Sequence, residues 1–394
     1  MPDWGTKVNV DRIVRDTLDL VNIKSETGDT RALAERYEEM LLEVGCKVTK
    51  YEWITNNPTI VAVFDPENEP GDSHQGKTIL FNGHMDVITL PHDPPRVENG
   101  RLYGRGACDM KGSLASIIEV MRVLREIGSR LPFRLVVVAN SLHEGPGGRG
   151  EDLIALLEQV EIRADAAMVM EGATFDCTVS QLGAATFEIG ISRDGNPSHQ
   201  LYTPEETPHP ITVAAEIVRT LEEMNEGLKQ RYIEDIGHAS YFIGSLHSGQ
   251  FYNQFPARAE LAGIRRYAND DSYADVEAEL RDMLERMADR HRVRIDANIK
   301  KVRDGYRIDK HDLAVAALTK AVRIVRNHDL PLVGKKVVTD AGIIANKLGI
   351  PALCHGPNQQ SAHADVEYVE IGELELTVKV YLQFIKEYVG DVLV

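Results

Sequence analysis

Histidines and carboxylates follow the ends of several short apolar segments in this 394-residue chain. They are His84 with Asp86, Asp109, His143 with Glu144, Glu171 and His363. Imidazole and carboxylate ligands together are typical of sites for zinc, manganese or cobalt. The set is larger than one structural zinc ion needs and would suffice for two divalent metal ions sharing a bridging carboxylate. Such a pair can activate water and polarise a carbonyl.

Each of these residues, taken alone, is equally typical of a helix cap, a turn or a solvated surface. The spacing of His84 and Asp86 adds one detail, because residues two apart in an extended chain point to the same side. Asp86 is therefore placed to fix the tautomer of a ligating His84.

Alternating helices and buried strands surround these residues. The expected strands are 77–81, 134–139, 166–170 and 352–353, and the expected helices include 8–23, 30–44, 111–127, 311–326 and 371–388. This order predicts an α/β domain with a largely parallel sheet. Ligands bind at the carboxyl ends of such strands, where the polar residues occur.

The pattern changes in the middle of the chain. Residues 184–302 read as strand, helix, two strands, helix and strand, the order of a ferredoxin-like α+β module. We therefore expect a discontinuous catalytic domain, 1–183 and 303–394, with the module inserted in it.

A glycine-rich run offers a competing interpretation. Gly145–Gly150 fits the pattern G-x-G-x-x-G, and Glu171 follows at the distance of a ribose-binding acid, which would indicate an NAD-dependent dehydrogenase. Two features weigh against it: Glu144 stands where the pyrophosphate would approach, and the run lies in mid-chain. The glycines more simply let the chain turn tightly past a metal ligand.

Longer runs of the sequence resemble one family across nearly the whole chain. It is the dinuclear metallohydrolase family of acetylornithine deacetylase, succinyl-diaminopimelate desuccinylase, aminoacylase and carboxypeptidase G. The similar runs are Gly83–Val87, Tyr103–Gly112, Thr339–Ala341, Gly356–Pro357, Ala362–His363 and Glu367–Val369. The resemblance implies a zinc-peptidase-like catalytic domain and a lid domain that usually dimerises.

The same resemblance implies roles for the individual residues. Asp109 would bridge two metal ions, most readily zinc, with manganese or cobalt as alternatives. The other ligands would be His84, Glu144, Glu171 and His363, with Asp86 orienting His84.

The lid residues have implied roles of their own. His199, in the run Gly195–His199, matches a lid histidine that steadies the oxyanion, often across a dimer interface. Asn253 and Arg265 match residues that grip a substrate carboxylate, a task suited to the planar, permanently charged guanidinium.

One position departs from the family. The family has two successive glutamates, a general base and a metal ligand, where this chain has His143 and Glu144. A neutral imidazole can accept a proton from metal-bound water near pH 7. Three interpretations follow: His143 is the base, the base comes from elsewhere, or the protein is a non-catalytic, metal-containing receptor.

Composition limits the partners. The chain has 44 Lys and Arg against 61 Asp and Glu, a formal net charge of −17, which argues against nucleic acids and acidic membranes. Four scattered cysteines and the lack of an apolar leader or spanning segment predict a cytoplasmic protein. The expected activity is hydrolysis of an amide C–N bond in an N-acyl or N-carbamoyl amino acid or short peptide that carries a carboxylate.

Overall fold

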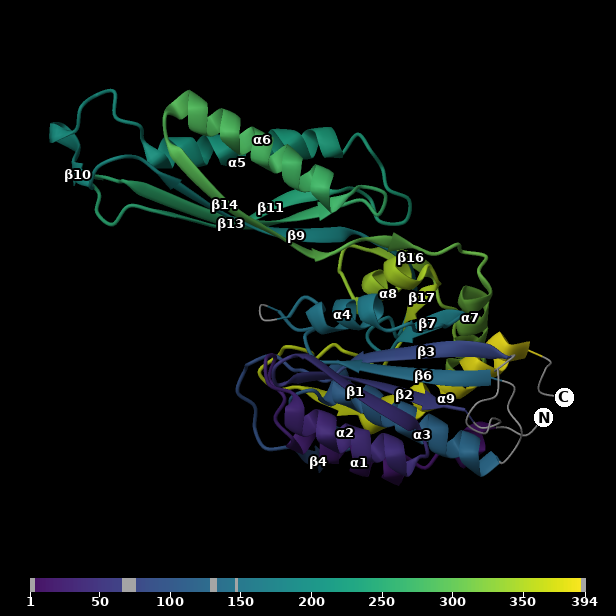
Figure 1. Ribbon diagram of the computed structural model, residues 1–394. Coiled ribbons are helices and arrows are strands. Elements are labelled where there is room, and N and C mark those ends of the chain that lie inside the picture. Colours follow the sequence, from purple (N-terminus) through teal and green to yellow (C-terminus); the bar gives the residue numbers. More distant parts are fainter. Residues whose placement is uncertain (1–3, 66–75, 128–132, 146–147, 391–394) are drawn as a thin grey trace. The chain divides into compact units, whose positions relative to one another are not determined.

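The computed structural model describes residues 4–65, 76–127, 133–145 and 148–390. These residues form two compact units, each described here by itself (Figure 1). Unit 1 comprises the described residues of Met1–Val179, Ile308–Val333 and Thr339–Val394, and unit 2 comprises Ser180–Arg307 and Gly334–Val338. Unit 2 thus includes a few residues on each side of the expected module, and also the separate segment Gly334–Val338.

The main sheet of unit 1 has six strands. In spatial order they are β1 (Lys47–Ile54), β2 (Asn57–Phe64), β6 (Phe133–Asn140), β3 (Lys77–His84), β7 (Ala166–Val169) and β17 (Ala352–Cys354). The last four run parallel to one another. Their apolar residues are almost completely buried, as expected for parallel strands covered on both faces.

The hairpin β1–β2 was not predicted from the sequence. It pairs antiparallel within itself, and β2 pairs antiparallel with β6. The signal is weak because β1 is an edge strand whose residues are mostly exposed or half-buried, with Lys50 and Glu52 on it. Charged residues are common on edge strands, where they discourage pairing with another chain.

Helices cover both faces of this sheet, with α1, α2 and α3 on one side and α4 and α8 on the other (Figure 1). The helices of unit 1 are α1 (Val10–Asn22), α2 (Arg31–Glu43), α3 (Gly112–Ile127), α4 (Glu151–Gln159), α7 (Leu313–Arg326), α8 (Asp340–Leu348) and α9 (Ile371–Val389). A small sheet adds β4 (Arg96–Glu98), β5 (Arg101–Tyr103) and β18 (Tyr368–Glu370). None of the helices in the described part of the chain is both long and apolar enough to cross a bilayer.

Unit 2 is a four-stranded antiparallel sheet with two helices on one face (Figure 1). The strands, in spatial order, are β11 (Ser240–Ser248), β13 (Arg258–Tyr267), β9 (Gly183–Ser192) and β14 (Arg294–Arg303), and the helices are α5 (Pro210–Leu228) and α6 (Tyr273–His291). Alternate residues of β9 and β13 pack against α5 and α6 to form the core. A short pair, β10 (Ser198–His199) and β12 (Gln254–Phe255), lies beyond the sheet. The chain passes between the units at β8 (Cys177–Gln181), β15 (Tyr306–Arg307) and β16 (Leu332–Lys335).

His355, directly after β17, is a fully buried histidine in unit 1. Its Nδ1 donates to the carbonyl of Ala173 at 3.1 Å, and its Nε2 has no hydrogen-bond partner among the described residues. Burial, helped by the positive charge of Arg326, lowers the pKa of His355 to about 3.

This buried ring makes the fold sensitive to acid. The unfolded chain takes up a proton at His355 near its ordinary pKa of about 6.5, whereas the folded chain does not until much lower pH. Stability is therefore lost as pH falls from about 6.5 towards 3, by about 1.4 kcal/mol for each pH unit at this residue. In urea titrations, the free energy of unfolding of the wild type should fall relative to His355→Gln over this range. The exposed His311→Gln serves as the control, and parallel curves for wild type and His355→Gln would contradict the prediction.

Candidate metal centre

The carboxyl ends of the parallel strands bring the predicted residues of unit 1 together. His84 is the last residue of β3, His143 and Glu144 follow β6, and Glu171 follows β7. His363 lies in the loop beyond β17. Because these strands are parallel neighbours, their ends meet at one edge of the sheet.

Asp109 lies at the centre of this group. Its Oδ1 is 3.2 Å from His84 Nε2, and its Oδ2 is 3.4 Å from His363 Nε2. A further carboxylate lies beside each histidine. Glu171 Oε2 is 3.6 Å from His84 Nε2, and Glu144 Oε1 is 3.0 Å from His363 Nε2. Each oxygen of Asp109 thus faces a different histidine, and each of these histidines lies beside a different carboxylate, an arrangement that suits a bridging ligand.

The donor set fits two divalent cations. Ligand atoms of His84, Asp109 and Glu144 all lie within 4.8 Å of one another, as do those of His84, His143 and Glu171. All five are buried or half-buried, whereas the side chain of His363 is 54% exposed and marks the open side. Nitrogen and carboxylate oxygen donors in this proportion suit zinc, manganese or cobalt.

The pKa values show how strongly the cluster attracts positive charge. Burial disfavours a charged His84, yet hydrogen bonds to Asp109, Asp86 and Glu171 outweigh it and raise its pKa. Hydrogen bonds to Asp109 and Glu144 raise the pKa of His363 to about 10. Burial opposes the charge on Asp109, but His363 and His84 lower its pKa. Metal binding would displace these protons, so its affinity should rise with pH.

Asp86 contacts both His84 and the segment that carries Glu144. Its backbone carbonyl accepts from His84 Nδ1 at 2.9 Å, while its carboxylate Oδ1 is 3.5 Å from the same atom. The carboxylate also accepts from the backbone N–H of Glu144 at 2.8 Å and from Thr27 Oγ1 at 2.8 Å. The expected contact with His84 is therefore made mainly by the backbone, and the carboxylate holds the turn that carries His143 and Glu144.

His143 lies flat against His84. Their rings are parallel within 6°, with centroids 4.2 Å apart. His143 Nδ1 is 3.0 Å from Asp340 Oδ2, and Nε2 is 3.6 Å from Glu171 Oε2. An imidazole binds a metal in the plane of its ring, so two stacked rings cannot both point at one ion without tilting. This geometry favours His143 as a neighbour of the metal pair over His143 as a further ligand.

The charge of His143 depends on its surroundings. Burial lowers its pKa, but the carboxylates of Asp340 and Glu171 outweigh burial and raise it to about 9. Divalent ions bound beside Glu171 would offset that field, because bound cations are the largest local charges in such a site. We therefore expect a neutral ring when metal is bound.

Sequence reasoning missed several supporting residues. Glu367 is 1% exposed and accepts from the backbone N–H groups of Gly106, Cys108 and Asp109 at 3.0–3.1 Å, which fixes the turn that presents Asp109. Gln359 Nε2 donates to Asp109 Oδ1 at 3.0 Å. Glu367 lies in a run that resembles the family, and that run was the only signal for it.

The remaining predicted residues lie in unit 2. His199 Nδ1 accepts from the backbone N–H of Leu201 at 3.2 Å, which fixes the orientation of the ring. Asn253 Nδ2 lies 3.2 Å from Nε2 of the same ring. These two residues lie together on the short pair β10–β12 and the turn before it.

Arg265 is differently placed from what its expected role requires. It is 3% exposed, on the helix-covered face of the sheet, with its guanidinium 4.6 Å from the ring of Tyr241 and 3.8 Å from Glu279. Its Nη1 donates to the backbone carbonyl of Arg266. These contacts hold Arg265 inside unit 2, and its expected role in gripping a substrate carboxylate stays a prediction.

The glycine-rich run can be followed only in part, because Pro146 and Gly147 lie outside the described residues. The N–H of Gly148 donates to the carbonyl of Glu144 and that of Gly150 to Leu142. The turn thus folds back on the metal-ligand segment. Glu171, the would-be ribose ligand, belongs to the carboxylate–imidazole cluster.

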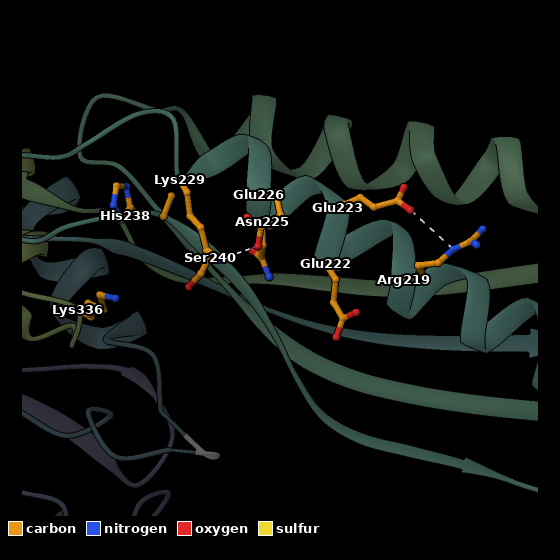
Figure 2. Close-up of a pocket in the computed structure, with 10 residues that line it drawn as sticks. Arg219, Glu222, Glu223, Asn225, Glu226, Lys229, His238, Ser240 and Lys336 are labelled. Carbon is orange, nitrogen blue, oxygen red and sulfur yellow. Dashed lines mark hydrogen bonds and ion pairs between the residues drawn. The ribbon is translucent and has the colours of Figure 1, made fainter.

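A separate surface hollow of about 620 Å³ lies in unit 2 beside α5 (Figure 2). Four of its charged side chains form ion pairs, Arg219 with Glu223 at 3.7 Å and Lys229 with Glu226 at 2.5 Å. None of the predicted site residues lines it. The hollow is therefore not a candidate for the chemistry.

Comparisons with known proteins show what the chain is similar to. The chain is 27% identical over 336 residues to a succinyl-diaminopimelate desuccinylase of Alkalilimnicola ehrlichii, covering 80% of this chain and 85% of that one. It is 26% identical over 270 residues to carboxypeptidase G2 of Pseudomonas sp., covering 66% and 61%.

Solved structures share the fold. Aminopeptidase PepT of Bacillus cereus superposes with a TM-score of 0.79 at 19% identity, covering 98% of this chain and all of that one. A Bacillus subtilis protein described as a dinuclear metal-binding peptidase of the M20 family gives a TM-score of 0.67 at 15% identity, covering 95% and 97%. Residues 80–387 match the model of peptidase family M20/M25/M40, so the chain belongs to that family of metal-dependent amide hydrolases.

Proposed function

We propose that this protein hydrolyses the amide C–N bond of N-acyl or N-carbamoyl amino acids or short peptides that carry a free carboxylate. The observation that carries the proposal is the position of Asp109, each of whose oxygens faces a different histidine. Succinyl-diaminopimelate desuccinylase and carboxypeptidase G2, named among its relatives, act on bonds of this class.

Two divalent ions, zinc by preference, would be held by Asp109 and the four outer ligands His84, Glu144, Glu171 and His363. When bound, they supply Lewis acidity that polarises the amide carbonyl and acidifies a water molecule. His143 Nε2 would accept a proton from a water molecule as its oxygen attacks the amide carbonyl carbon, and would return that proton to the amine nitrogen as the C–N bond breaks. His199 stabilises the oxyanion.

The carboxylate of the substrate needs a cation, and Arg266 is better placed than Arg265. Residues 265 and 266 point to opposite faces of β13 because side chains alternate along a strand. Nη1 of Arg266 is buried without a hydrogen-bond partner among the described residues, and burial lowers the pKa of this guanidinium. We assign the carboxylate to Arg266, with Asn253 as a neutral partner.

A homodimer through unit 2 is part of the proposal. β11 is an edge strand, and its Phe242 and Leu246 are 64% and 41% exposed. Near His199, the side chains of Tyr202 and Tyr252 are 84% and 91% exposed. Apolar groups exposed to this extent mark association surfaces.

A cytoplasmic location fits the four cysteines, all buried and free.

Metal content and turnover test the proposal together. Protein purified without chelator should contain about two zinc, manganese or cobalt ions per chain and release amine from a panel of N-acyl amino acids and dipeptides. Chelation should abolish release, and adding the metal back should restore it. Two ions without turnover on any substrate would favour a metal-containing receptor, and absence of metal after reconstitution would overturn the site.

A further inference from the structure

A second hollow in unit 2, of about 470 Å³, lies at the end of the sheet nearest β10 (Figure 1). Three arginines line it, Arg193, Arg258 and Arg294, and no aspartate or glutamate is among the described residues that do so. This lining contrasts with the formal net charge of the whole chain, which is −17. The volume falls within the range of about 300–1,000 Å³ that is usual for small-molecule sites. The lining therefore favours a ligand with negative charge.

The register of the sheet brings two of these arginines to one face. Arg258 on β13 and Arg294 on β14 both pair with Ser192 on β9, the strand between them. Side chains of residues directly opposite one another in antiparallel strands point to the same face. The neighbouring residues Ile191 and Ala259 belong to the core under the helices. The two arginines therefore lie together on the face that the helices leave open.

The charges of these two arginines are little used within the protein. The guanidinium of Arg258 has no partner among the described residues, and Arg294 Nη2 is 3.5 Å from the fully exposed carboxylate of Asp194. Glu260 and Asp296 lie two positions further along the same strands but form no ion pair with either arginine in the described part of the chain. Exposed ion pairs such as that with Asp194 contribute little to stability. A ligand can therefore engage both guanidinium groups without breaking a strong contact.

Arg193 has a different role, because its guanidinium holds the wall of the hollow. Its Nε donates to the carbonyl of Pro256 at 3.0 Å, its Nη1 to that of Asp194 at 2.7 Å and its Nη2 to that of Asn196 at 3.0 Å. The same group lies 5.2 Å from the ring of Phe255. Carbonyl oxygens are neutral acceptors, so these contacts fix the wall without cancelling the positive charge. The hollow is therefore held in shape by bonds that a ligand does not need to break.

We propose that this hollow is a binding site for a small oxyanion that carries at least two negative charges. The planar guanidinium fork matches carboxylate and phosphate groups alike, so a polycarboxylate and a phosphate ester share the required chemistry. Arg258 and Arg294 stand two strand spacings apart, about 10 Å between their backbones, and long side chains from both can reach one ligand. The site belongs to unit 2 and includes none of the candidate metal ligands, so it does not depend on the proposed hydrolysis.

Calorimetric titration of the metal-loaded protein tests the site with two probes, propane-1,2,3-tricarboxylate and glycerol 2-phosphate. Acetate, with a single charge, is the reference. At least one probe should bind more tightly than acetate, and its affinity should fall as salt is added because the two guanidinium groups are exposed. The probe that binds more tightly identifies the oxyanion as carboxylate or phosphate. If neither probe binds more tightly than acetate, the proposal is overturned.

Substitution of the arginines places the bound probe. Arg258→Gln and Arg294→Gln should each weaken binding by about tenfold, because each removes charge-assisted hydrogen bonds, and the double variant should show no saturable binding. Both side chains are exposed, so folding should not depend on them. Arg219→Gln removes the same charge from an exposed position of α5 and should weaken binding by no more than about twofold. Equal weakening by Arg219→Gln would show a general effect of charge and overturn the proposal.

The metal centre is the other place where an oxyanion can bind. Asp109→Ala, which removes the bridging carboxylate, should therefore keep the binding of the probe. Loss of binding in Asp109→Ala together with its retention in the double arginine variant would place the anion on the metal ions and overturn the site in unit 2.

Discussion

Replacing Asp109 with alanine should eliminate stable binding of the metal pair and lower kcat/KM by about 10³-fold or more. Asp109 faces both His84 and His363, so its loss would leave each of the two metal ions with fewer ligand atoms. Lewis-acid activation by metal supplies several kcal/mol of transition-state stabilisation, and each 1.4 kcal/mol corresponds to about tenfold in rate. The loss should therefore not be recovered by raising the substrate concentration.

Metal analysis and steady-state kinetics on the same preparation check this result. Asp282→Ala, which removes an exposed aspartate of α6 in unit 2, is the control and should keep both metals and activity. Unfolding measured in chelator should show that Asp109→Ala remains folded. Full metal content in Asp109→Ala would contradict its bridging position.

The same variant tests whether His199 serves the site of a second copy. Asp109→Ala and His199→Ala should each be inactive or severely impaired alone. If His199 acts across a dimer, mixed dimers should regain activity, because one site then combines an intact metal centre with an intact partner histidine. Proven mixed dimers without activity would place His199 in the same chain as the metals it serves.

The clustering of the candidate metal ligands could be predicted because they follow strands, and the ends of neighbouring parallel strands meet at one edge of the sheet. Residues 84, 144 and 171 are tied to their places by β3, β6 and β7. Asp340 could not be found in that way. An aspartate at the start of a helix is common for local reasons, since it interacts favourably with the helix N-terminus. Only the packing of α8 shows that it contacts His143.

The burial of Arg265 has a simple physical origin. Alternation along a strand puts one of two adjacent arginines on each face. Ala259 and Leu261 belong to the core of unit 2, so odd-numbered residues of β13 point inwards and Arg265 is among them.

The hairpin β1–β2 is a part of the fold that the sequence pattern did not predict. The outer strand, β1, carries charged residues and has little buried surface. Its sequence therefore lacks the alternation of apolar and polar residues that indicates a strand. The strand conformation of β1 is stabilised by its pairing with β2, and β2 is in turn held by its pairing with β6.

His143 is where the second large effect is expected. His143→Ala should lower kcat by about 10²–10⁴-fold, the usual contribution of a positioned general base. About two metal ions per chain should remain, because the ring is stacked parallel to that of His84 and does not lie in position to share its ion. His311→Ala, at an exposed histidine, is the matched control for loss of an imidazole.

The comparison with His143→Glu separates the possible roles of the ring. A glutamate restores the residue that the family has at this position, so its kcat should exceed that of His143→Ala by at least about tenfold if the position accepts a proton. A glutamate variant no better than alanine would mean that the ring does something a carboxylate cannot, such as contacting the substrate. Loss of one metal ion in His143→Ala would instead show that the ring tilts out of its stack to become a ligand, and the base would then have to come from another residue. Metal content and kcat, measured on the same two variants, therefore distinguish a base, a substrate contact and a ligand.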